Sequence, residues 1–187
     1  MLAFLTSMVL GLVILAAVGL AGLLPYRAGL SALGLTRTEI FSPRILAMIC
    51  GVLLTSLGAT ALYSVIVTSI GIEILMPPDI PQRIVFPGSG AVLTFIALAL
   101  WTPITEEIFF RGFIFAGLTP RLGVTRAMIA SALIFSVFHL APGVMIPIFI
   151  TGLLLAWLYR QTGSVWPSIA AHAGQNSVAL LVTIAGF

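Results

Sequence analysis

Five long stretches without charged residues alternate with short charged segments: residues 1–26, 45–72, 84–105, 127–159 and 161–187. A membrane-spanning helix needs about 20 mostly apolar residues, so four stretches predict one span each. As a single helix, the fourth stretch would be about 50 Å long, well beyond a hydrocarbon core of roughly 30 Å. Ala141-Pro142-Gly143 lies near its middle and breaks a helix. We therefore expect two helices there, over 127–140 and 144–159, and about six membrane helices in all.

Composition supports a membrane protein. The chain has 187 residues, of which 60% are hydrophobic and 7% are charged, whereas a soluble domain has about 25% charged residues. Such a chain has too little polar surface for a soluble fold and is too apolar to be disordered. We expect an all-α membrane protein whose helices surround a polar cavity. It would have one domain over residues 1–187, and the part that carries the polar motifs would cover about residues 88–187. Residues 1–24 lack a basic start and a cleavage site, so we expect a retained span rather than a signal peptide.

The basic residues predict the orientation in the membrane. All eight are arginines, and the formal net charge is +3. With six spans, three loops on one side carry six arginines: Arg27, Arg37, Arg44, Arg121, Arg126 and Arg160. The opposite side has Arg83 with Glu73 and Asp79, so we expect the arginine-rich side to face the cytoplasm of a prokaryotic plasma membrane. Scattered arginines form no nucleic-acid patch, and the expected partners are the lipid bilayer and a membrane-associated substrate.

Three groups of polar residues interrupt the apolar helices. They are Glu106, Glu107 and Arg111 in the third helix, His139 in the fourth, and His172 with Asn176 in the sixth. Ionisable residues within spans are costly and mark functional sites by default. This pattern predicts that Glu106, His139, His172 and Asn176 share one site.

Helical spacing separates the two glutamates. Glu107 and Arg111 are four residues apart, so they share a helix face and can form a bracing ion pair. Glu106 points about 100° away and has no local cation, which leaves it available for proton transfer. Alternatively, all three charges lie in interfacial water at a helix end.

The histidines and the asparagine also allow more than one interpretation. His139 and His172 can simply be hydrogen-bond partners between helices. His172 and Asn176 are four residues apart and can donate to one oxyanion, or can tie helices together. Glu106, His139 and His172 could instead bind zinc, although no H-E-x-x-H motif is present. Cys50 is the only cysteine, which excludes a disulfide and a cysteine zinc site.

The three groups together resemble a known family. The segments are T-E-E-I-F-F-R-G at 105–112, F-S-V-F-H at 135–139 and H-A-G-Q-N at 172–176. They are similar to the motifs of the CPBP intramembrane proteases, also called the Abi or type II CAAX prenyl endopeptidase-like family, over about residues 101–179. L-G-L-T-R at 33–37 resembles a family loop as well.

The resemblance implies a bundle of membrane helices around a polar cavity, and hydrolysis of a peptide bond by activated water. By motif, Glu106 and His139 would activate the water, and His172 with Asn176 would form the oxyanion site. Glu107 and Arg111 would brace the helix. The family is labelled metalloprotease, while a glutamate mechanism without metal is also argued for it, so zinc stays an alternative cofactor.

Two other functions are compatible with the pattern. One is a non-catalytic membrane protein, such as a bacteriocin-immunity or scaffold factor, which the intact motifs disfavour. The other is a small transporter with a proton relay through Glu106, His139 and His172, which the lack of internal repeats disfavours.

Overall fold

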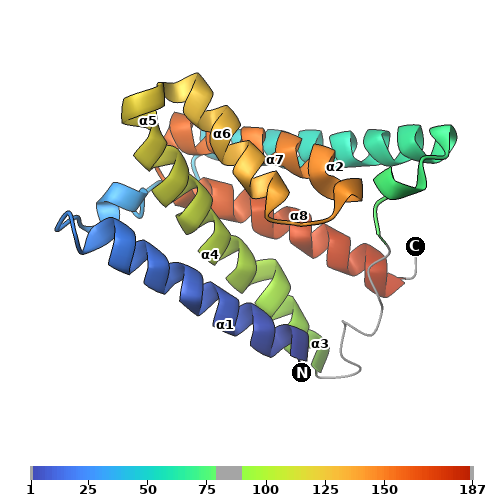
Figure 1. The fold of residues 1–187 in the computed structure, drawn as a ribbon, viewed down its shortest axis with the longest axis horizontal. Coiled ribbons are helices and arrows are strands. Elements are labelled where there is room, and N and C mark those ends of the chain that lie inside the picture. Colours follow the sequence, from blue (N-terminus) through green and yellow to red (C-terminus); the bar gives the residue numbers. More distant parts are fainter. Residues whose placement is uncertain (1, 79–89, 186–187) are drawn as a thin grey trace.

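The computed structural model describes residues 2–78 and 90–185, and these residues form helices and connections without a strand (Figure 1). The elements in chain order are α1 (Leu2–Ala17), η1 (Val18–Leu23), η2 (Leu30–Leu33), α2 (Pro43–Ile70), η3 (Glu73–Leu75), α3 (Gly90–Phe95), η5 (Ile96–Trp101), α4 (Thr102–Glu107), η6 (Ile108–Phe115), α5 (Ala116–Leu122), α6 (Val124–Val137), α7 (Pro142–Thr162) and α8 (Val165–Ala185). The predicted all-helical fold class is confirmed for this part of the chain. Its extent as one domain stays a prediction.

Residues 90–122 form one continuous helical rod. The segments α3, η5, α4, η6 and α5 follow one another without a turn, and right-handed helical residues join the last four of them. Two of the segments, η5 and η6, are π-helical. The uncharged stretch that predicted the third span ends at residue 105, and the helix continues beyond it through the charged motif to Leu122. The motif therefore lies inside a helix and not in interfacial water at its end.

The predicted break inside residues 127–159 is present. Helix α6 ends at Val137 and α7 begins at Pro142. Leu140 between them has a positive φ of 51°, a conformation that L-residues seldom adopt. Pro142 occupies the first turn of α7, where its missing N–H leaves no helical bond unmade.

Four helical stretches are long and apolar enough to cross a membrane: Phe4–Leu23, Pro43–Ile70, Val92–Leu122 and Pro142–Thr162. Helix α6 has 14 residues and is about 21 Å long. Helix α8 has 21 residues, as many as α7, but carries His172, Gln175 and Asn176 in its middle and is not among the four. The structure thus supports an integral membrane protein with four candidate spans among the described residues. The predicted count of six spans would require α6 and α8 as well.

Glycines allow the helices near the motifs to approach closely. A Cβ at Gly152 of α7 would lie 3.0 Å from Cα and Cβ of Ala132 on α6. A Cβ at Gly112 in η6 would lie 2.6 Å from the backbone oxygen of Leu33. These two contacts fix α7 and the loop before α2 against the elements that carry the motifs.

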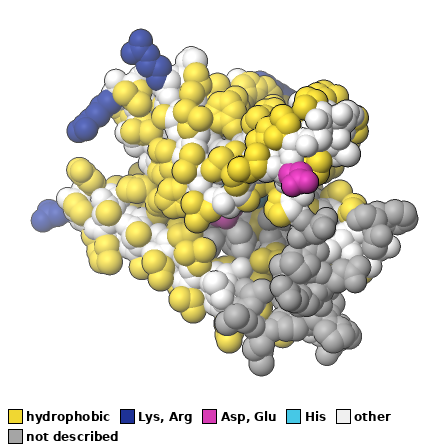
Figure 2. Space-filling model, turned by 45° about the vertical axis from the view of Figure 1, so that its right-hand side comes forward, with side chains coloured by type: hydrophobic (Ala, Val, Ile, Leu, Met, Phe, Trp, Pro, Cys, Tyr) yellow, Lys and Arg dark blue, Asp and Glu magenta, His cyan; other side chains and the backbone are white. Residues whose placement is uncertain are grey.

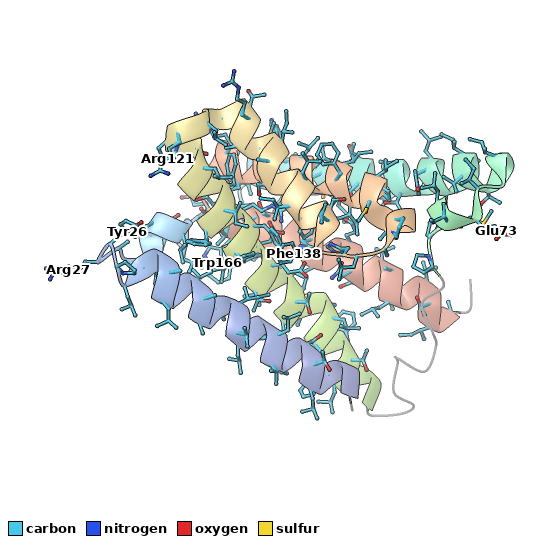
Figure 3. The ribbon with its side chains drawn as sticks, in the orientation of Figure 1. Tyr26, Arg27, Glu73, Arg121, Phe138 and Trp166 are labelled. Carbon is cyan, nitrogen blue, oxygen red and sulfur yellow. The ribbon has the colours of Figure 1, made fainter. Side chains whose placement is uncertain are left out.

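The two ends of the molecule differ in charge. Figure 3 shows Arg27 and Arg121 at one end, and Glu73 at the other. Figure 2 shows mostly hydrophobic side chains on the described part of one face, with basic side chains along its left-hand edge. The first loop and the loop after α5 therefore lie on the same side, as the six-span arrangement requires. Asp79 and Arg83, which the sequence assigns to the opposite side, lie outside the described residues.

Labelling of single cysteines tests the orientation. In a Cys50→Ser background, Thr162→Cys lies at the end of α7 and Ile72→Cys follows the far end of α2. Because arginine-rich loops stay in the cytoplasm, we expect a membrane-impermeant maleimide to label Ile72→Cys in intact cells and Thr162→Cys only after permeabilisation. The opposite pattern would reverse the orientation.

Candidate active site

The buried carboxylate of Glu107 joins two basic side chains. Its Oε1 accepts a hydrogen bond from Nη1 of Arg111 at 2.7 Å and one from Nδ1 of His172 at 2.9 Å. The side chains of Glu107 and Arg111 are 0% exposed. The predicted ion pair between them is therefore present, and it extends to α8, a contact that the sequence spacing does not predict.

Arg111 also binds the helices on its other side. Its Nη2 donates to the carbonyl oxygen of Gly152 at 3.3 Å. The guanidinium carbon lies 4.4 Å from the ring centroid of Phe135 on α6, which is a favourable cation–π distance. Through Glu107 and Arg111, the helix of residues 90–122 is thus connected to α6, α7 and α8.

His172 lies between the two glutamates. An ionised carboxylate only accepts hydrogen bonds, so Nδ1 of His172 carries the proton that it donates to Glu107. Its other nitrogen, Nε2, lies 3.7 Å from Oε2 of Glu106. His172 is therefore held by one glutamate and presents its free ring edge to the other.

Glu106 and His139 line a cavity of about 220 Å³ beside α1. The Glu106 side chain is 20% exposed, in contrast to buried Glu107. The remaining lining is apolar and comes from α1 and three phenylalanines: Leu10, Val13, Ile14, Ala17, Phe109, Phe110 and Phe138. The two neighbouring glutamates thus occupy different environments, as their angular separation on the helix predicts.

The orientation of the His139 ring follows from its hydrogen bond. Nδ1 lies 2.8 Å from the carbonyl oxygen of Phe135, four residues earlier. A carbonyl can only accept, so Nδ1 donates and the neutral ring has its lone pair on Nε2. The Phe135 ring packs edge-on against both His139 and His172, with centroid distances of 4.9 and 5.7 Å. Phe135 thus positions both histidines, a role that its apolar side chain does not reveal in the sequence.

Asn176 satisfies a carbonyl that Pro103 leaves without a donor. In the π-helical η5, Ala97 accepts from the N–H five residues later. The equivalent partner of Leu98 is Pro103, which has no N–H. Nδ2 of Asn176 donates to the Leu98 oxygen at 2.9 Å. Asn176 therefore ties α8 to the helix about two turns before Glu106, and its amide keeps a second N–H.

A second polar network holds α8 on its other side. The Ser56 hydroxyl on α2 donates to Oε1 of Gln175 at 2.8 Å and lies 2.6 Å from the hydroxyl of Thr151 on α7. We did not assign a role to Gln175 from the sequence. Its place beside His172 and Asn176 in α8 is a signal in the sequence, whereas Ser56 and Thr151 lie in apolar stretches without a charged residue nearby.

The donor set does not fit a three-ligand metal site. Among the described residues, no group of three His, Cys, Asp or Glu side chains could hold a metal ion. In the alternative zinc set of Glu106, His139 and His172, Nδ1 of each imidazole is engaged with Phe135 or Glu107, so only Nε2 of each ring is left as a possible ligand.

Comparison with known proteins identifies one family. Residues 88–178 match the family model described as "Type II CAAX prenyl endopeptidase Rce1-like". The match includes all three motifs and confirms the family resemblance; α1 and α2 lie outside it. No significant match was found to a curated protein or to a solved structure.

Replacing Arg111 tests the buried network. Arg111→Ala leaves the carboxylate of Glu107 without its cation, and breaking a buried pair costs about 3–5 kcal/mol. We expect low yield in membranes and a clearly lowered Tm in detergent. Arg126→Ala, an exposed position on α6, is the matched control and should change stability by about 0.5 kcal/mol or less. Arg111→Ala protein with the wild-type Tm would contradict the bracing role.

Proposed function

We propose, from the match of residues 88–178 to the Rce1-like type II CAAX prenyl endopeptidase family model, that this chain is an intramembrane endopeptidase. Its substrate would be a membrane-associated peptide or protein of the CAAX type, and the reaction would be hydrolysis of a peptide bond. The observation that carries the proposal is the shared cavity of Glu106 and His139, with Nε2 of His172 3.7 Å from the Glu106 carboxylate.

The attacking water would be activated by Glu106 and His139. Ionised Glu106 is an acceptor and can take the proton of a water in the cavity. The lone pair on Nε2 of His139 can orient the same water, because Nδ1 is occupied by Phe135. The apolar lining would keep other water away and strengthen these interactions. A purely binding role gives no reason for an accessible carboxylate beside two imidazoles in an apolar cavity.

His172 and Asn176 are proposed as donors to the oxyanion. When His172 is protonated, Nε2 can donate to a substrate oxygen beside Glu106 while Glu107 stabilises the imidazolium through Nδ1. Asn176 has a second amide N–H beyond the one given to Leu98. Glu107 and Arg111 would act as positioning residues, since both are buried away from the cavity.

Glu106→Gln tests the proposed base. Glutamine keeps the shape of the side chain but accepts no proton at neutral pH. Wild-type folding and substrate binding should persist, while turnover of a membrane-anchored peptide should fall at least 100- to 1,000-fold, about the cost of losing one catalytic donor. Glu73→Gln, an exposed acid at the end of the molecule, should leave turnover unchanged. Normal turnover by Glu106→Gln would exclude this residue as the base.

Asn176→Ala tests the oxyanion role separately. We expect kcat to fall by about 100- to 1,000-fold with little change in KM, because the donor acts in the transition state. Ser177→Ala is the matched control, since the Ser177 hydroxyl bonds only its own helix at Ala173. If Asn176→Ala lowers Tm but keeps the wild-type kcat, Asn176 only satisfies the Leu98 carbonyl.

A further inference from the structure

A groove lies on the outer face of the molecule, away from Glu106 and Glu107. Its volume is about 640 Å³, and it lies between α2 and α7. Ala47, Gly51 and Thr55 of α2 follow at four-residue intervals along it, opposite Leu154 and Trp157 of α7. A Cβ at Gly51 would meet no heavy atom within 4 Å. The groove is therefore open at Gly51 and is lined mainly by apolar or small side chains.

One end of the groove carries a positively charged side chain. Arg44 is an exposed residue in the first turn of α2 and lines the groove. The ion pairs of the described residues do not include Arg44. Trp157, which lines the groove with Arg44, is 39% exposed. Tryptophan and arginine are the residues that occur at the boundary between the hydrocarbon core and the headgroups.

The length of the groove matches one leaflet. Arg44 and Thr55 are eleven positions apart on one helix, which is about 16 Å along its axis. This is about half of a hydrocarbon core of roughly 30 Å. With Arg44 at headgroup level, the groove thus reaches close to the bilayer midplane, as an acyl chain of one leaflet does.

We propose that this groove binds one anionic phospholipid, with an acyl chain along Ala47, Gly51 and Thr55 and the phosphate at Arg44. The charge is complementary, because the arginine-rich loops place this end on the predicted cytoplasmic side, where the leaflet contains anionic lipid. Zwitterionic phospholipid would fit the apolar part of the groove but would gain less from Arg44. The site uses α2 and α7 and none of the residues proposed for hydrolysis.

Native mass spectrometry of the full chain can test this site. The protein would be released from nanodiscs containing equal amounts of dioleoyl phosphatidylglycerol and dioleoyl phosphatidylcholine. We expect one phosphatidylglycerol to be retained in preference to phosphatidylcholine. Arg44→Gln should reduce this preference about five-fold, the effect of one basic residue at an anionic surface. Arg126→Gln, an exposed arginine on α6 outside the groove, should keep the wild-type preference.

Filling the groove tests the acyl-chain position. Gly51→Leu should remove the retained lipid, whereas Gly58→Leu should keep it, because Gly58 on the same helix also has open space around its Cβ but does not line the groove. Wild-type retention by Gly51→Leu, or equal retention of both lipids by the wild-type protein, would overturn the proposal. So would a dimer that Gly51→Leu dissociates, since a second copy would then occupy the groove.

Discussion

A carboxylate buried in a membrane interior needs hydrogen-bond or ion-pair partners. The Glu107 carboxylate has them on two elements, η6 and α8. It is 0% exposed and binds Arg111 on its own helix and His172 on α8. Arg111 in turn contacts Gly152 of α7 and the ring of Phe135 on α6. In low dielectric these contacts are strong, and removal of one partner leaves an uncompensated charge. Contacts that begin at this ion pair therefore connect four helices.

This arrangement also places two adjacent glutamates in different surroundings. Glu107 points into the protein and orients His172, while Glu106 is 20% exposed beside the cavity. Each histidine has its Nδ1 engaged by an acceptor, so that Nε2 remains for other contacts. The proposed hydrolysis needs reacting groups that are fixed and accessible at once. Here buried contacts fix the side chains, and the cavity beside α1 leaves Glu106 and His139 accessible.

Helices α1 and α2, which lie outside the family match, line the cavity beside Glu106 and the groove at Arg44. Four residues of α1 form one wall of the cavity that contains Glu106 and His139. Trp101 binds this helix to the motif-bearing rod, since its Nε1 donates to the backbone oxygen of Ser7 at 3.0 Å. Helix α2 supplies Ser56 to the network around Gln175 and most of the groove at Arg44.

The sequence by itself determined the features that depend on neighbours along the chain. Apolar stretches define the helices, Pro142 starts α7, and the spacing of Glu107 and Arg111 places them on one face, because a helix brings residues four apart together. The sequence left open whether the charges of this motif lie in water at a helix end; tertiary contacts bury Glu107 and Arg111 inside the helix instead. Only the tertiary structure decided that Glu107 rather than Glu106 holds His172, and that Asn176 binds the Leu98 carbonyl. Those partners are 65 and 78 residues apart, and helix packing, which no local pattern encodes, brings them into contact.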